Sequence, residues 1–151
     1  MKFMVAFSSP KRSARVVERA AIHAKATGSE LVLVRIIPDP EKVGVVAQLI
    51  STDKPIDKAQ QQIDEVVGKL KEQGVNASGF VRVGEVAKSL VKIASDELKA
   101  DILFVGTTNV GGKAFFLMEK DPIVHFLVDH CPASLYLVRH EPGDPLDDPI
   151  V

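Results

Sequence analysis

Short apolar segments alternate with amphipathic helical segments along most of this chain. The clearest apolar segment, residues 31–37 (LVLVRII), is almost entirely aliphatic, which is typical of a parallel strand covered on both faces. Four further segments are predicted to be strands: residues 3–7, 77–83, 102–105 and 135–138. Strands that alternate with helices favour a parallel sheet, because each parallel connection needs a long crossover.

The segments between these strands have apolar residues at helical spacing. We expect helices over residues 11–27, 56–70, 86–98 and 115–128. Gly28 is placed as the C-cap of the first helix, and Pro122 either lies in a first helical turn or breaks the last one. The result is a single doubly wound α/β domain with a five-stranded, mostly parallel sheet and helices on both faces. The commonest strand orders for such a domain are 3-2-1-4-5 and 2-1-3-4-5.

Length and charge exclude several classes of protein. A chain of 151 residues suits one domain, and a net charge of −1 gives no overall attraction to nucleic acid or to an anionic membrane. The single cysteine, Cys131, excludes an intramolecular disulfide and a multi-cysteine zinc site. No apolar run approaches the roughly 20 residues that span a bilayer, so we expect a cytoplasmic protein without membrane insertion.

Two segments fall outside the regular pattern. Residues 141–151 contain four acidic residues, three prolines and no Lys or Arg, so we separate this acidic, Pro-rich C-terminal tail from a domain over residues 1–140. The tail is either a solvated end or a segment that docks on a partner. Residues 41–55 are too apolar for a free loop and fit a lid, a short helix or an oligomer contact.

The candidate site consists of two loops that follow the first and fourth strands. In a sheet of order 3-2-1-4-5 these loops meet where the winding direction reverses, which is where such sheets bind ligands. Both loops are rich in hydroxyls, glycines and basic residues. The candidate residues are Ser8, Ser9, Lys11 and Arg12 in the first loop and Gly106, Thr107, Asn109, Gly111, Gly112 and Lys113 in the second.

The first loop has the residues of a helix start. Ser9 is a good N-cap and Pro10 a good first helical residue, which places Lys11 and Arg12 in the first turn. The helix dipole disfavours cations there, and a bound anion would remove that conflict. The alternative is that both cationic side chains extend into water.

The second loop does not match a nucleotide-binding P-loop. That motif needs a glycine at position 107 and Ser or Thr at position 114, where this chain has Thr107 and Ala114. The four histidines are not spaced for a metal site, and we expect neither a bound metal nor a catalytic residue.

Four stretches of the chain resemble the universal stress protein family over residues 1–140. They are the opening strand and its loop at 3–9, the turn at 84–87, the segment DILFVGT at 101–107, and Cys131-Pro132 before an aliphatic strand. The resemblance implies a sheet of order 3-2-1-4-5. It also implies a homodimer formed through the last strand, Leu135 to Val138.

Nucleotide-binding members of this family carry G-x2-G-x9-G-[ST] after the fourth strand. Gly106 matches the first glycine, whereas Asn109, Glu119 and Lys120 stand at the other three positions. Asn109 tolerates the left-handed backbone that some glycines provide. Glu119 adds bulk and negative charge where the family's backbone meets phosphate oxygens, and Lys120 offsets only the charge. The first loop departs as well, because Ser8 stands where the family often has an acidic residue.

The resemblance therefore predicts a regulatory or binding module with weak or no ATP binding and no catalytic turnover. Two alternatives stay open. One is an ATP-binding or other nucleotide-binding universal stress protein with a variant phosphate loop, in which Gly111 and Gly112 match a glycine pair common in the family. The other is an anion-sensing accessory domain of a transporter or kinase, and no protein partner can be named.

We expect the double change Glu119→Gly with Lys120→Ser to raise ATP affinity at least about tenfold. A carboxylate and a phosphate roughly 5 Å apart repel by about 3 kcal/mol at an effective dielectric of 20, and the change removes this repulsion together with the bulk. Calorimetry at fixed ionic strength measures the affinity, with Lys120→Ser alone as the control. Low-micromolar ATP binding by the unaltered protein would contradict the expectation.

Overall fold

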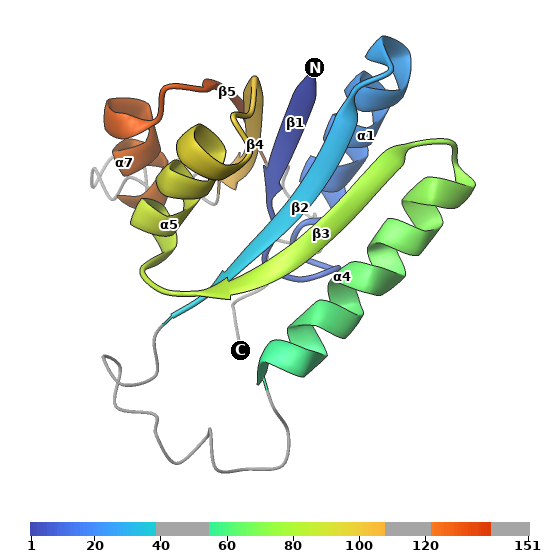
Figure 1. Cartoon of the computed structure of the whole chain (residues 1–151), viewed down its shortest axis with the longest axis horizontal. Coiled ribbons are helices and arrows are strands. Elements are labelled where there is room, and N and C mark those ends of the chain that lie inside the picture. Colours follow the sequence, from blue (N-terminus) through green and yellow to red (C-terminus); the bar gives the residue numbers. More distant parts are fainter. Residues whose placement is uncertain (39–54, 108–121, 140–151) are drawn as a thin grey trace.

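Five parallel strands form one sheet in the part of the chain that the computed structural model describes, residues 1–38, 55–107 and 122–139 (Figure 1). The expectations for residues 41–54, for the start of the last helix and for the acidic tail lie outside those ranges. The strand order is β3-β2-β1-β4-β5, and all four neighbouring pairs are parallel, as predicted. The strands are β1 (Lys2–Ala6), β2 (Glu30–Ile37), β3 (Asn76–Val83), β4 (Ile102–Thr107) and β5 (Ser134–Arg139).

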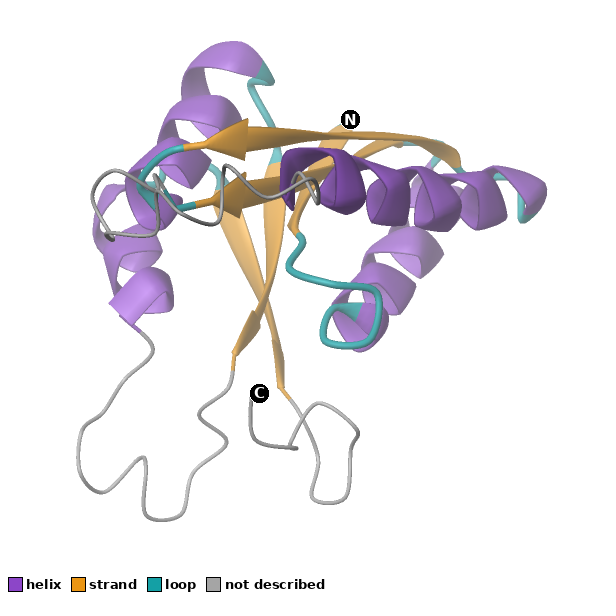
Figure 2. Ribbon diagram, turned by 90° about the horizontal axis from the view of Figure 1, so that it is seen from below, coloured by secondary structure: helices purple, strands orange, loops and turns teal. Residues whose placement is uncertain are grey.

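Helices cover both faces of this sheet, which confirms the doubly wound architecture (Figure 2). On one face lie α1 (Ala14–Thr27) and α4 (Pro55–Glu72). On the other lie α5 (Val86–Lys92), the short π-helix η1 (Ile93–Glu97) and α7 (Pro122–His130). Pro122 is the first residue of α7, where a proline is tolerated. Gly28 ends α1 in the left-handed conformation, as predicted.

Most element boundaries differ from the prediction by at least one residue, and three of the differences stand out. The helix expected over residues 86–98 changes to π geometry at Ile93, where the Leu98 amide donates to the Ile93 carbonyl at 2.8 Å. The fourth strand runs through Gly106 and Thr107 because both residues pair with β5. The first helix begins at Ala14, three residues later than expected.

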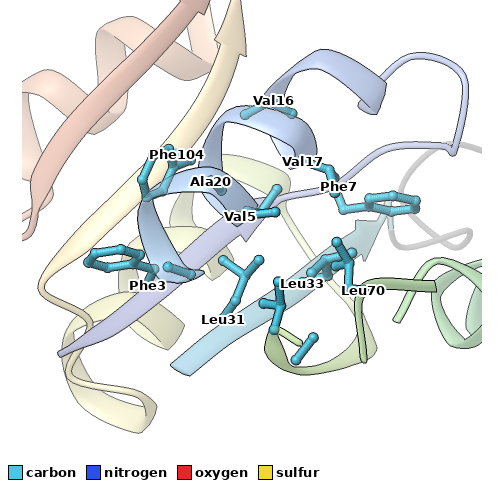
Figure 3. Packing of buried hydrophobic residues seen from close by; sticks show 14 of the residues in the cluster. Phe3, Val5, Phe7, Val16, Val17, Ala20, Leu31, Leu33, Leu70 and Phe104 are labelled. Carbon is cyan, nitrogen blue, oxygen red and sulfur yellow. The ribbon is translucent and has the colours of Figure 1, made fainter. Parts of the chain in front are cut away.

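Successive side chains of the central strands point to opposite faces of the sheet and pack in two separate cores. Phe3 and Val5 of β1, with Leu31 and Leu33 of β2, point toward α1 and α4, and Figure 3 shows these side chains beneath α1. Met4 of β1 and Val32, Val34 and Ile36 of β2 point toward α5, η1 and α7. This two-sided burial explains why residues 31–37 read as a nearly continuous apolar run.

Reciprocal hydrogen bonds at the amino edge align β1 with β4. The Lys2 amide donates to the Asp101 carboxylate at 2.8 Å, and the Asp101 amide donates to the Lys2 carbonyl at 2.8 Å. The Asp101 carbonyl also accepts the Ser134 amide of β5 at 3.1 Å. Asp101 therefore connects β1, β4 and β5 by hydrogen bonds at the edge opposite the candidate site.

The contact between β3 and α4 leaves no room for a side chain at Gly79. A Cβ there would lie 2.9 Å from the Leu33 carbonyl oxygen and would also meet Ile63. We expect Gly79→Ala to lower the free energy of unfolding by ~1–3 kcal/mol, measured in urea. The control is Gly68→Ala on the exposed side of α4, where nothing lies within 4 Å. That change should stabilise the protein by ~0.4–1 kcal/mol, and equal effects of both changes would contradict the packing.

Candidate ligand-binding site at the carboxyl edge of the sheet

A hollow of about 310 Å³ opens at the carboxyl edge of the sheet, where β1 and β4 separate. Its floor comes from the ends of β2, β1 and β4, and its walls come from the start of α1 and from α5 and α7. Most of the lining is apolar, with Ala6, Val16, Val34, Leu90, Val105 and Ile123 among the residues that form it. The polar residues that line it are Ser8, Arg12, Ser13 and Arg35, together with Gly106.

This location confirms that the loop after β1 and the end of β4 lie at the same end of the sheet. Ser8, Arg12 and Gly106 line the hollow together, although 98 residues of sequence separate Ser8 from Gly106. Ser9 and Lys11 belong to the same turn but do not line it. Thr107 is a buried residue of β4 rather than part of a loop. The other predicted site residues lie outside the described part of the chain: Asn109, Gly111, Gly112, Lys113, Glu119 and Lys120.

Ser9 does not cap α1, which corrects the prediction for the first loop. The N-cap residue of α1 is Ser13, whereas Ser9 stabilises the preceding turn, in which its Oγ accepts the Arg12 amide at 3.1 Å. The Ser13 amide donates to the Ser9 carbonyl at 2.9 Å and closes that turn. Lys11 and Arg12 therefore lie before the first turn of α1, so the proposed conflict with its dipole does not arise.

The Ser13 side chain holds the loop in place at the mouth of the hollow. Its buried Oγ accepts the Ser8 amide at 2.8 Å and lies 3.2 Å from the Ser8 Oγ. Upstream, the Phe7 amide donates to the Val34 carbonyl at 2.9 Å, which continues the β1–β2 pairing past the end of β1. These bonds fix where the chain turns away from the sheet, and thereby where Ser8 and Arg12 meet the hollow.

Arg35 is a lining residue that the sequence reading missed. It is the one charged residue within 31–37, and that interruption of an apolar strand was the available signal. Its guanidinium Nη1 donates to the Gln62 Oε1 of α4 at 3.4 Å, which is long for a hydrogen bond. Partial burial lowers the pKa of Arg35, because desolvation disfavours its charged form.

A second hollow, of about 510 Å³, lies between α1 and the C-terminal end of α4. Its polar lining residues are Glu18, Lys25 and Gln73, so it carries both signs of charge. Its residues come from helix surfaces and from Val75, just before β3, rather than from the carboxyl ends of the strands. The first hollow is therefore the better candidate for a ligand site, because doubly wound sheets bind ligands at those ends.

The described residues offer neither a metal-binding cluster nor a membrane-spanning helix. In residues 1–38, 55–107 and 122–139, no three His, Cys, Asp or Glu side chains converge in a way that could hold a metal ion. Across the same ranges, every helix is too short or too polar to cross a membrane.

Comparison with known proteins places the whole domain in one family. Residues 1–139 match the model of the Universal stress protein family. Among curated protein sequences, none is significantly similar to this chain.

Solved structures share this fold at low sequence identity. Universal stress protein UspA from Lactobacillus plantarum is 14% identical, with a TM-score of 0.72 over 92% of this chain and 97% of that chain. The Archaeoglobus fulgidus universal stress protein in complex with dAMP is 18% identical, with a TM-score of 0.67 over 91% and 96%. An Arabidopsis thaliana family protein with AMP bound is 17% identical, with a TM-score of 0.67 over 98% and 99%.

Proposed function

This chain belongs to the universal stress protein family, and we propose that it is a regulatory binding module whose carboxyl-edge hollow takes a nucleotide or a related anion. The observation that carries the proposal is the composition of that hollow. Arg12 and Ser8 line a largely apolar space, and no acidic side chain is among its described lining residues. A ligand with an apolar body and negative charge matches such a lining, and about 310 Å³ lies in the range of small-molecule sites.

Two of the similar structures support a nucleotide as the ligand. The Archaeoglobus protein is in complex with dAMP and the Arabidopsis protein has AMP bound. Both share the fold that brings the carboxyl ends of the strands together in this chain. We extend this ligand class to the present protein as part of the proposal, with weak ATP affinity because Glu119 stands at a glycine position of the family's phosphate motif.

The described lining supports binding rather than catalysis. A hydroxyl nucleophile needs a general base within hydrogen-bond reach. The lining hydroxyls are those of Ser8 and Ser13, which lie 3.2 Å from each other. Neither a histidine nor a carboxylate is among the described residues that line the hollow. The absence of turnover stays part of the proposal.

We expect Arg12→Glu to weaken nucleoside monophosphate binding at least about tenfold, because it places a negative charge beside the anion. Calorimetry with AMP and IMP measures the effect. Arg19→Glu is the matched control, since Arg19 lies on the exposed side of α1 and does not line the hollow. Both variants change the net charge equally, so equal losses would place the anion elsewhere.

The exposed edge of β5 supports a further part of the proposal, that the protein forms a homodimer. β5 is one outer strand of the sheet, and its Leu137 side chain is 45% exposed. An open strand edge is stabilised when a second strand covers it. If two copies pair through residues 135–138, the β5 edge of each copy is covered by that of the other.

We expect Leu137→Lys to convert the dimer to a monomer, since two lysines would meet across the pairing. Light scattering at tens of micromolar measures the mass. Val83→Lys on β3, the opposite edge of the sheet, is the control, because Val83 is also 45% exposed. A monomer in the unaltered protein, or dissociation by Val83→Lys alone, would contradict this interface.

A further inference from the structure

One row of side chains along α1 is basic. Arg15, Arg19 and His23 recur at intervals of four residues, so they lie in one row on the helix surface. Lys11, in the turn before the helix, continues the same spacing. Lys11, Arg19 and His23 are exposed, and Arg15 is half-buried. These four residues form the basic ridge of α1.

Contacts of α1 show which way this ridge faces. The Nε2 atom of His23 lies 3.3 Å from the hydroxyl of Tyr136, so the His23 end of the ridge faces β5. The one acidic residue of α1, Glu18, lines the second hollow instead, on the side toward α4. Among the described residues, Arg19 takes part in no ion pair. The β5 side of α1 therefore carries positive charge that Glu18 does not offset.

The chain enters an acidic segment at the edge of the sheet where this ridge begins. Residues 141–151 carry four carboxylates and no Lys or Arg. They follow β5, which ends at Arg139 on the carboxyl edge, beside the end of β4. α1 starts at the same edge, where Arg12 of the preceding turn lines the hollow together with Gly106 of β4. Chain connectivity and charge thus both favour a contact between the segment and the ridge.

We propose that the basic ridge of α1 binds the acidic residues 141–148 of the same chain. This contact lies outside the carboxyl-edge hollow and requires no nucleotide there. The proposal therefore stands or fails independently of the proposed function.

The spacing of the charges on the two partners is compatible. Glu141, Asp144 and Asp147 recur at every third residue, in a segment with three prolines. Proline favours the polyproline II conformation, in which every third residue lies on the same side, and carboxylates at 141 and 147 would then be about 19 Å apart. The ridge from Lys11 to His23 extends about 18 Å at the rise of an α-helix. An extended segment running back along α1 would therefore present a carboxylate to each part of the ridge.

Weak individual ion pairs suffice for such a contact. An exposed pair of Arg and carboxylate contributes little to stability by itself. A segment joined to its binding surface by a short stretch of chain is present at an effective concentration on the order of millimolar, so several weak pairs can form together. The contact should depend strongly on ionic strength, because the charges of exposed side chains are screened by salt.

Paramagnetic relaxation measured by NMR tests the proposal. A nitroxide is attached to the variant Ile150→Cys, which also carries Cys131→Ser because Cys131 is the only native cysteine. The isotope-labelled, spin-labelled chain is mixed with an excess of unlabelled chain, so that only a contact within one copy is detected. We expect the amide signals of Arg15, Arg19 and His23 to lose intensity. Salt at about 1 M, where the screening length is about 3 Å, should restore them.

Charge reversal separates a specific contact from the nearness of a tethered segment. R15E/R19E should restore the α1 signals, because the segment is then repelled. K69E/K71E is the matched control, since it changes the net charge equally at exposed positions in the last turn of α4, at the opposite edge of the sheet. The loss of intensity should persist in that control. Thermal unfolding shows that each variant is folded.

A charge swap completes the test. E141K/D144K/D147K added to R15E/R19E should bring the loss of intensity back, because the signs are then reversed on both partners. The proposal is overturned if the α1 signals keep their intensity in the unreversed chain, if R15E/R19E and K69E/K71E act equally, or if the swap restores nothing. Signal loss only when the spin label and the isotope label are on different chains would assign the segment to a second copy, which also overturns it.

Discussion

The parallel pairing of β1 with β4 is the interaction on which the site depends. These strands are far apart in sequence, and their pairing makes the chain wind in opposite directions from the centre of the sheet. At the amino edge, the Lys2–Asp101 hydrogen bonds hold the two strands in register, and within the core the Phe3 and Phe104 rings lie 5.4 Å apart. At the carboxyl edge, no described residue forms an equivalent contact between the strand ends. The hollow is thus a consequence of the winding.

The charge of that hollow distinguishes this protein from what the family resemblance alone implies. Ser8 supplies a hydroxyl where the family often has a carboxylate, and Arg12 adds a cation in the same loop. Without a carboxylate in this loop, the described lining is better suited to electron-rich groups of a ligand. The fold provides the space, and a few strand and loop residues decide what fills it.

Most of the fold could be predicted because each strand has an apolar pattern of its own. The pattern left two strand orders open, and the family resemblance selected the correct one. The start of α1 could not be placed, because Ser9-Pro10 has the composition of a helix start and Ser9 does accept an amide, but one turn too early. Arg35 was missed because residues 31–37 were read only as core. Which residues of a buried strand line a cavity depends on the twist and the neighbouring helices, and a local pattern contains neither.

The central claim is that the ligand site lies at the carboxyl edge, and backbone amide NMR during a titration with AMP tests it most directly. The account predicts that the largest chemical-shift changes occur at Ser8, Arg12, Arg35 and Gly106, which are distant in sequence but line one hollow. Changes concentrated at Glu18, Lys25 and Gln73 would place the ligand between α1 and α4 and would contradict the account.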